Sequence, residues 1–343
     1  MNDSHDVIHV GIDLGTSRSA ISAADSQRHL IDSFVGWPVD LVARKILKKD
    51  VLIGREAVDN RTMLDLRRPL ERGLIKEGAE RDTQAVRELL QYLLSLVGLD
   101  PELQNRPRIR AVVGAPAEAL RVNKQQLRAA MQGLADHVMI VSEPFAVAYG
   151  QEALLHTMII DIGAGTTDFC VMNGHYPTDE DQRTLDTAGD LIDMKLSTLI
   201  QERYPNAQFT LHMIRSWKEQ WGYISKTKAR VMITAPVAAK PTELDITDEM
   251  RMACEILVPP ISETMLELIA RVEPEFQESV RENIILAGGS ALVTGLREAL
   301  ENDLSEVGGG KVRVVSNPDY AGSDGALAIA LDALDTDWDV LTT

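Results

Sequence analysis

The sequence predicts an α/β protein of two related lobes, and three observations lead to this fold class. First, 45% of the 343 residues are hydrophobic, and a chain of this length usually forms more than one hydrophobic core. Second, the same pattern of strand, glycine turn and strand occurs once in each half of the chain. Third, short apolar strands alternate with amphipathic helices, which favours parallel sheets covered by helices.

The repeated pattern occupies residues 7–21 and 158–171. In each copy apolar residues alternate along a strand, the chain turns at glycines, and the alternation resumes after the turn. Asp13 and Asp161 hold the same place near the end of the first strand. Such internal repetition predicts two related lobes that each open with the same hairpin.

The remaining elements follow from hydrophobic periodicity. Residues 83–99 place apolar side chains at helical spacing, and Gly98 offers a C-terminal stop. Further helices are expected over residues 123–134, 190–204, 263–272 and 295–304. Strands are expected over residues 109–113, 139–141 and 284–287, with an extended stretch over residues 231–246.

The charge balance and the start of the chain limit where the protein acts. With 52 acidic and 35 basic residues the formal net charge is -17, which would repel nucleic acid and anionic lipids. The start, MNDSHDV, lacks the basic region and apolar run of a signal peptide. We therefore expect a cytoplasmic protein without nucleic-acid partners or direct membrane insertion. Cys170 and Cys254 form no metal-binding pattern and are expected to be reduced and buried.

Both hairpins carry residues suited to a metal-bound phosphate. Residues 11–17 (GIDLGTS) and 161–168 (DIGAGTTD) each combine an acid on a strand with small residues at the turn. Backbone N–H groups of such a turn can approach a phosphate while the acid faces a hydrated cation. Either segment alone is also typical of an ordinary glycine hairpin. A dinucleotide-binding motif is excluded, because a strand and not a helix follows each turn.

A third glycine motif, residues 286–290 (LAGGS), follows one expected strand and precedes an expected helix. Backbone without side chains can pack flat against a base or a sugar at such a place, although a plain helix-entry turn explains the motif equally well. By contrast, the glycine run at residues 308–310 lacks the context of a phosphate-binding loop and predicts a surface turn.

Several segments, taken in their order along the chain, resemble one known group of proteins. They are FVGWPVD (34–40), LDLRRPLERGLI (64–75), VSEPFAVAYG (141–150), IIDIGAGTTDFC (159–170), ILAGGS (285–290) and GSDGALAIAL (322–331). The set resembles the actin, Hsp70 and sugar-kinase ATPase superfamily. Within that superfamily it is most similar to the bacterial actins related to MreB, and among these to the members associated with magnetosomes.

The resemblance implies an actin-like ATPase fold of four subdomains, with a ribonuclease H-like core in each lobe and a nucleotide cleft between the lobes. Lobe I would comprise residues 1–156 and the C-terminal segment 323–343, with a small subdomain inserted at about 33–78. Lobe II would comprise residues 157–322, with a small subdomain inserted at about 190–250.

The resemblance also implies a role for each candidate residue. Asp13 and Asp161 would hold Mg²⁺ through water and help to position the attacking water. Glu143 would orient or deprotonate that water, unless it only caps the helix that follows Pro144. The groups donating to phosphate oxygens would be those of Gly15, Thr16, Ser17, Gly163, Gly165, Thr166 and Thr167.

The nucleoside side of the cleft would be formed by the third glycine motif and two segments of the second lobe. Gly189 would sit near the phosphates or ribose at the positive end of its helix. Gly288, Gly289 and Ser290 would line the adenosine. Relatives commonly carry a glutamate and, three residues later, a lysine in this pocket. Here Arg215 precedes Lys218, and an arginine cannot accept a proton from a ribose hydroxyl.

Trp217 and Trp221 flank this segment and are expected as core anchors rather than as base-stacking groups. ATP and ADP with Mg²⁺ are the implied ligands, and ATP is expected to bind in preference to GTP.

The implied function is an ATP-hydrolysing filament, with head-to-tail contacts between copies of the chain. It would lie in the cytoplasm alongside magnetosomes and position magnetosome chains through an adaptor protein. An MreB-type organiser of cell shape is the nearest alternative, although the acidic start does not suit membrane binding. A small-molecule kinase would need a second-substrate motif, and a chaperone ATPase would need a further peptide-binding domain.

Overall fold

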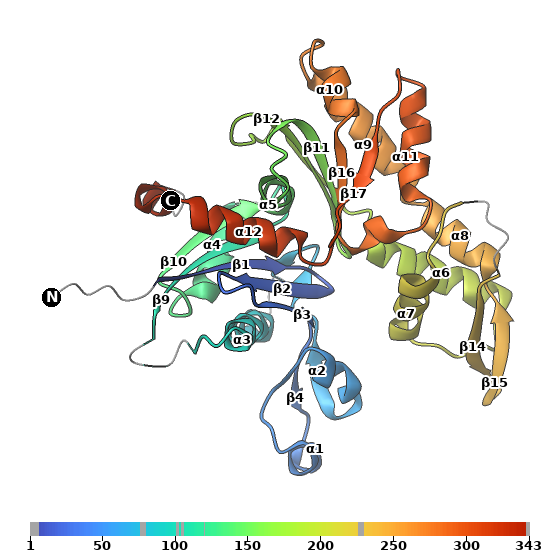
Figure 1. Cartoon of the computed structure of the whole chain (residues 1–343). Helices are drawn as coiled ribbons and strands as arrows, with labels where there is room; N and C mark the ends of the chain where they lie inside the picture. Colours follow the sequence, from blue (N-terminus) through green and yellow to red (C-terminus); the bar gives the residue numbers. More distant parts are fainter. Residues whose placement is uncertain are drawn as a thin grey trace.

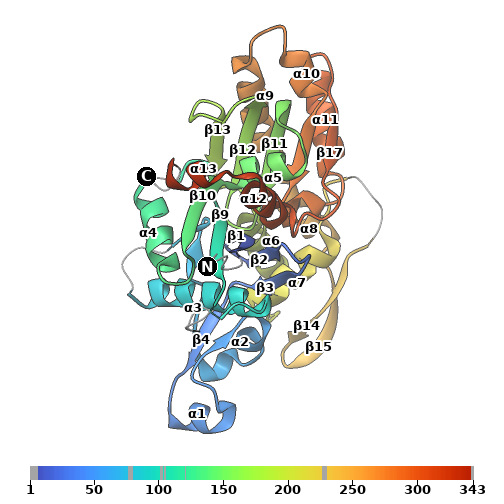
Figure 2. The ribbon, with the colours of Figure 1, turned by 60° about the vertical axis from the view of Figure 1, so that its left-hand side comes forward.

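Two five-stranded sheets form the centre of the protein, in a computed structural model that describes residues 7–75, 80–100, 103, 106–119, 121–225 and 230–340. Each sheet is extended by a smaller group of strands and helices (Figure 1). The turned view shows both smaller groups at the lower end of the molecule, with the sheets above them (Figure 2). The predicted α/β fold is confirmed, whereas the acidic start at residues 1–6 lies outside the described residues.

The first sheet contains the first predicted hairpin. In spatial order its strands are β10 (His137–Ser142), β9 (Arg108–Ala115), β1 (Val7–Leu14), β2 (Arg18–Ala23) and β3 (Arg28–Asp32). Strand β1 pairs in parallel with β9 and antiparallel with β2. Helices α3 (Glu80–Leu96) and α4 (Arg121–Met131) pack on one face of this sheet. The apolar residues at helical spacing in α3 are buried there, which confirms the predicted helix.

The second sheet repeats this arrangement with the second hairpin. Its strands are, in spatial order, β13 (Gln182–Leu185), β12 (Thr167–Asn173), β11 (Leu155–Ile162), β16 (Ile284–Ala287) and β17 (Val312–Val314). Strand β11 pairs in parallel with β16 and antiparallel with β12, as β1 does with β9 and β2. The core on its outer face includes residues of α6 (Gly189–Arg203), α8 (Thr247–Glu255), α9 (Val258–Arg271), α10 (Gln277–Arg281) and α11 (Leu296–Ser305).

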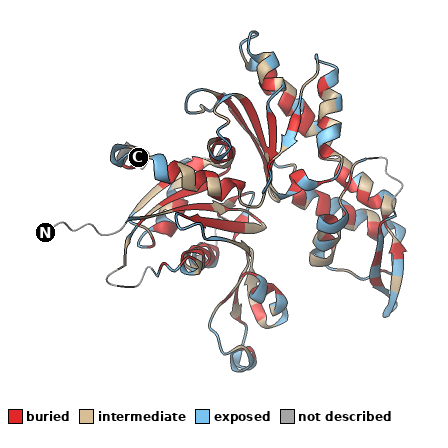
Figure 3. Cartoon of the chain, viewed as in Figure 1, coloured by how far each residue is buried: buried red, intermediate tan, exposed pale blue. Residues whose placement is uncertain are grey.

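Two helices lie between the sheets, α5 (Glu143–Gly150) and α12 (Ala321–Asp332). One buried cluster joins them to side chains of both sheets, among them Met139 of the first sheet and Ile159 of the second. The short helix α13 (Asp335–Val340) adds Trp338, which is 1% exposed, to the same cluster. Buried residues therefore run continuously from one sheet to the other through α5 and α12 (Figure 3).

The smaller groups of elements extend the two sheets on one side. The first has β4 (Val35–Pro38), α1 (Leu41–Leu47), β5 (Leu52–Ile53), α2 (Arg55–Asp59), the 3₁₀ turn Arg61–Met63, β6 (Leu64–Arg67), β7 (Leu70–Glu71) and β8 (Leu74–Ile75). The second has α7 (Leu211–Trp221) and the hairpin of β14 (Met232–Val237) and β15 (Lys240–Asp245). Their places suit the two predicted insertions, while the boundaries of lobes and subdomains stay a prediction.

Most of the smaller expectations are confirmed, and one is wrong. Both cysteines are free and buried. The glycine run at residues 308–310 is a loop in which Gly308 and Gly309 adopt positive φ values of 105° and 85°. Trp221, expected as a core anchor, is instead 42% exposed on the last turn of α7. No helix in the described part of the chain has the length and apolar character to span a membrane.

The contact between α5 and α12 is close enough to require glycine. A Cβ on Gly325 would overlap the carbonyl group of Ala146, and a Cβ on Gly150 would stand 2.8 Å from the Cα of Gly325. The backbones of the two helices are therefore in direct contact at this point.

We predict that Gly325→Ala lowers the free energy of unfolding by about 2 kcal/mol, because overpacking outweighs the roughly 1 kcal/mol that alanine contributes to a helix. Thermal denaturation measures the change. Gly289→Ala is the matched control, since its Cβ would meet no atom within 4 Å. A Gly325→Ala protein as stable as the wild type would contradict the packing argument.

Candidate functional site

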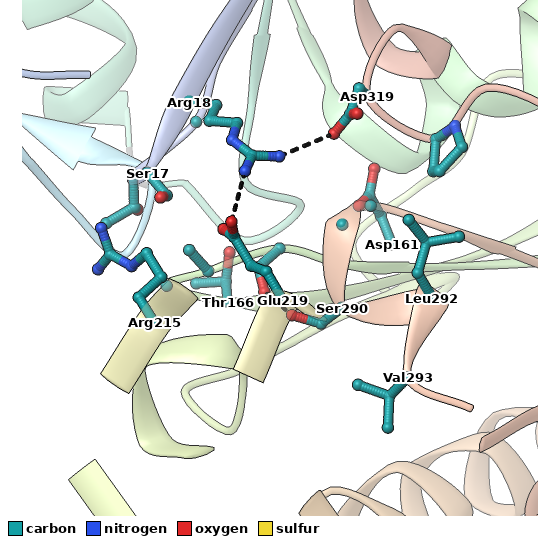
Figure 4. A pocket seen from close by; sticks show the side chains of 18 of the residues that line it. Ser17, Arg18, Asp161, Thr166, Arg215, Glu219, Ser290, Leu292, Val293 and Asp319 are labelled. Atoms are coloured by element: carbon teal, nitrogen blue, oxygen red, sulfur yellow. Dashed lines mark hydrogen bonds and ion pairs between the residues drawn. The ribbon is translucent and has the colours of Figure 1, made fainter. Parts of the chain in front are cut away.

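A cavity of about 470 Å³ lies between the two hairpins. Most of the sequence-predicted site residues line it: Asp13, Gly15, Thr16, Ser17, Glu143, Asp161, Gly163, Gly165, Thr166, Arg215, Lys218, Gly288, Gly289 and Ser290. Segments that are far apart in the sequence thus meet around one space, and Figure 4 shows part of its wall.

The two hairpin turns approach each other across this cavity. The hydroxyl group of Thr16, in the first turn, accepts a hydrogen bond from the backbone N–H of Gly73 (2.7 Å). A Cβ on Gly165, in the second turn, would stand 2.5 Å from Thr16 Oγ1 and 2.9 Å from Arg72 Cα. Residue 165 therefore has to be glycine if the turns are to come this close.

Asp13 and Asp161 occupy equivalent places in the two sheets. Asp13 lies beside Gly114 of the parallel neighbour β9, and Asp161 lies beside Ala287 of the parallel neighbour β16. Glycine also packs against each carboxyl group. A Cβ on Gly322 would stand 2.6 Å from Asp13 Oδ2, and a Cβ on Gly288 would overlap Asp161 Oδ1. The repeat seen in the sequence is thus a repeat of local geometry around two acids.

Glu143 is the first residue of α5, and the N-cap position belongs to Ser142. Its Oε1 atom is buried and has no hydrogen-bond partner among the described residues. A capping role would use this carboxylate on backbone N–H groups, so the structure does not favour that alternative. The free oxygen atom is available to a ligand or a water molecule in the cavity.

Three buried carboxyl groups at the cavity, those of Asp13, Asp161 and Glu143, resist ionisation. Burial, and then the charge of Asp319, raises the pKa of Asp13 to about 6. The pKa of Asp161 lies well above its usual value because of burial and the neighbouring charge of Asp13. Burial, followed by the charge of Asp13, also raises the pKa of Glu143 well above its usual value. The site therefore concentrates negative charge that a bound cation would stabilise.

The acids fit a magnesium ion that shares its ligands with a phosphate. In the described residues no group of three or more His, Cys, Asp or Glu side chains could hold a metal ion by itself. Mg²⁺ is usually bound by one or two carboxylates, with phosphate oxygens and water as the other ligands. Asp13 and Asp161 would supply those carboxylates.

The wall contributed by α7 is built from paired charges. Lys218 Nζ lies 2.8 Å from Asp193 Oδ1 and donates to the carbonyl of Gly189 (2.8 Å). Arg215 lines the cavity, but its guanidinium is engaged by Asp190 (3.2 Å) and Asp193 (3.4 Å). These contacts leave Arg215 oriented toward acids of α6.

Two predicted residues lie behind the cavity wall rather than on it. The hydroxyl group of Thr167 donates to the carbonyl of Thr187 (2.7 Å), and Thr167 is fully buried. The backbone N–H of Gly189 donates to the carbonyl of Gly163 (3.1 Å). Both residues support the second turn, and neither is part of the cavity lining.

Three charged residues of the lining, Arg18, Glu219 and Asp319, were not identified from the sequence. Arg18 ends the first turn, and its guanidinium lies 2.8 Å from Glu219 Oε2 and 3.5 Å from Asp319 Oδ1, across the opening drawn in Figure 4. The spacing offered a signal for Glu219, because it lies four residues after Arg215 and therefore on the same face of α7. No comparable signal exists for Asp319, which comes from a loop far along the chain.

The sheets, the paired hairpins and the cavity between them define a two-lobed protein of the actin-like class. The chain belongs to the MreB/Mbl family, whose sequence profile matches residues 7–336. It is 36% identical over 323 residues to the actin-like protein MamK of Paramagnetospirillum magneticum, covering 94% of this chain and 92% of the relative. MamK of Magnetospirillum gryphiswaldense is also 36% identical over 323 residues, which cover 94% of this chain and 89% of that protein.

Solved structures of MamK share the fold. A MamK double helical filament matches with a TM-score of 0.92 at 35% identity, covering 96% of this chain and 100% of that one. A non-polymerising MamK mutant bound to AMPPNP matches with a TM-score of 0.72 at the same identity, and the coverage is again 96% and 100%. This chain therefore matches the filament subunit better than the non-polymerising mutant.

We predict that Asp13→Asn raises the melting temperature of the nucleotide-free protein, and does so more at pH 7.5 than at pH 5. The folded-state pKa of about 6 exceeds the ordinary value of 3.8, so the folded state loses stability as pH rises between these values. Above pH 6 the free energy of unfolding is lower by up to about 3 kcal/mol than it would be without this pKa shift. Thermal denaturation at both pH values measures it, and an equal shift at both would contradict the assignment.

Proposed function

We propose that the protein is an ATP-dependent, filament-forming bacterial actin that hydrolyses the ATP it binds. The observation that carries this proposal is the pair of equivalent hairpins that face one cavity with Asp13 and Asp161. Membership of the MreB/Mbl family and the similarity to MamK filaments support the same function. The AMPPNP-bound relative supports the choice of an adenine nucleotide.

The nucleotide would lie in the cavity with its phosphates between the two turns. Small residues there let backbone N–H groups approach phosphate oxygens. Lys218, Gly288 and Ser290 would flank the nucleoside. Glu219 lines the cavity, and its carboxylate would accept a hydrogen bond from a ribose hydroxyl group. Arg215 cannot do so, because a guanidinium has no acceptor atom.

Hydrolysis depends on the positions of a few side chains. Asp13 and Asp161 would hold the ion, and bound Mg²⁺ would neutralise phosphate charge. Glu143 would accept a hydrogen bond from the attacking water through its unpartnered Oε1 atom. Its raised pKa makes the ionised group a better proton acceptor.

Assembly would be head to tail, with the cleft conformation linked to the contacts between subunits. The lower TM-score against the non-polymerising MamK mutant supports such a link, because this chain matches the filament subunit better. By analogy with MamK we also propose a cytoplasmic filament that positions magnetosomes through an adaptor protein.

Electron microscopy and a phosphate-release assay test the function together. Purified protein with MgATP and no added substrate should form filaments and release phosphate. A kinase of the same fold would form no filaments and would require a second substrate. Filaments that form equally well without nucleotide would contradict the coupling.

We predict that Glu143→Gln slows phosphate release at least about 100-fold, because it removes the proton acceptor while preserving shape. Filaments should still form with ATP and should persist longer. Phosphate release and pelleting are measured on the same samples. Wild-type turnover in the variant would remove the catalytic assignment of Glu143.

We further predict that raising KCl from about 50 mM to about 200 mM increases the pelleted fraction in ATP. Subunits with a net charge of -17 repel one another, and salt shortens the range of that repulsion to about 8 Å at physiological ionic strength. A pelleted fraction that does not rise across this range would show that net repulsion does not limit assembly.

A further inference from the structure

Arg68 occupies a place between the two lobes that its sequence context did not reveal. It follows β6 in the segment at residues 64–75, which resembled the family but carried no role in the site. Its Nε atom donates to the carbonyl of Thr16 (2.8 Å). Its two terminal nitrogens face Asp190, with Nη1 2.8 Å from Oδ2 and Nη2 3.0 Å from Oδ1. All three nitrogen atoms of the guanidinium are thus engaged, one by the Thr16 carbonyl and two by the Asp190 carboxylate.

Those two partners connect Arg68 to both hairpin turns. Thr16 belongs to the first turn and lines the cavity. Asp190 is the second residue of α6, and its backbone N–H donates to the carbonyl of Ala164 in the second turn (2.7 Å). A displacement of either turn would therefore stretch the contacts of Arg68.

Further charges extend the contact to the nucleoside wall. Asp190 also forms an ion pair with Arg215 (3.2 Å). Asp193 forms ion pairs with Arg215 (3.4 Å) and with Lys218 (2.8 Å). Basic and acidic side chains alternate from Arg68 to Lys218, and the Thr16 carbonyl lies at the start of this path. Both ends of the path, Thr16 and Lys218, line the cavity.

The low solvent exposure of the pair Arg68–Asp190 distinguishes it from other ion pairs between the lobes. The side chains of Arg68 and Asp190 are 22% and 31% exposed. In the Arg72 pair with Asp186 the values are 59% and 60%, and exposed pairs of this kind contribute little. Bidentate contacts of a partly buried arginine are stronger and more directional than such exposed ion pairs.

We propose that Arg68 holds the cleft closed around bound nucleotide by tying the first phosphate-facing turn to α6 of the second lobe. This inference rests on the proposed nucleotide function. Arg68 is a positioning residue, since it contacts the backbone of the turn and not the cavity. A phosphate bound at the first turn would order that turn and so fix the position of the Thr16 carbonyl. Arg68, which donates to this carbonyl, would then stay in place to pair with Asp190. By linkage, the same contact strengthens binding of the nucleotide, and we expect this gain as slower release, because affinity changes within one site lie mostly in the dissociation rate.

The test measures how fast a fluorescent ATP analogue leaves the protein with Mg²⁺, by stopped flow at protein concentrations too low for assembly. Arg68→Gln should release the analogue about tenfold faster, the effect of losing one charge-assisted contact. Arg67→Gln is the matched control, because Arg67 is the neighbouring residue and pairs with Asp65 in its own small sheet. It should stay within about twofold of wild type.

Two more variants keep the result interpretable. Arg68→Lys retains the charge but cannot serve both partners at once, so an intermediate rate is expected, and this variant replaces Arg68→Gln if the latter does not fold. Asp190→Asn should also release faster. Adding Arg68→Gln to it should have little further effect, because both changes break the same contact.

The possible failures are distinct. A wild-type protein that does not bind the analogue overturns the proposed function and this inference with it. A wild-type protein that binds, beside an Arg68→Gln variant that releases at the same rate, overturns this inference alone. Effects of Arg68→Gln and Asp190→Asn that multiply in the double variant would also overturn it.

Discussion

The organisation of the cleft depends on buried carboxyl groups that lie close together, with too few basic side chains beside them to balance their charge. Asp13, Asp161 and Glu143 face one cavity, and burial raises the pKa of each. Arg215 and Lys218, the cations on the α7 wall, are already engaged by Asp190 and Asp193. Within the part of the chain that the structure describes, these three acids therefore form no ion pair with a basic side chain. This deficit suits the proposed function, in which a cation would arrive together with a phosphate.

The repeat explains how one short sequence pattern could produce such a site. Each copy carries an aspartate at the last position but one of a central strand, beside a parallel neighbour. A glycine packs against each carboxyl group, Gly322 against Asp13 and Gly288 against Asp161. The two copies face each other because α5 and α12 fill the space between the sheets. A charge cluster that neither lobe could form alone thus results from the packing of two similar lobes.

The sequence allowed the repeated hairpins, the principal helices and most of the cavity lining to be predicted. Those features depend on local periodicity and on turn chemistry, which are read directly from consecutive residues. The role of Arg68 could not be predicted, because it depends on tertiary contacts with Thr16 and Asp190 from distant segments. Glu219 was missed for a different reason, since the family pattern drew attention to Arg215 one turn earlier. Trp221 was placed in the core from its residue type, yet α7 ends at the surface.

The glycine contact between α5 and α12 bears on how the two halves of the molecule can move. Where Gly325 meets Ala146 and Gly150, no side chains interlock, so sliding there requires no change of rotamer. Small rotations are resisted mainly by the surrounding cluster, whose residues come from both sheets. Backbone atoms alone therefore set the spacing of α5 and α12, and the two sheets pack against helices held at that spacing.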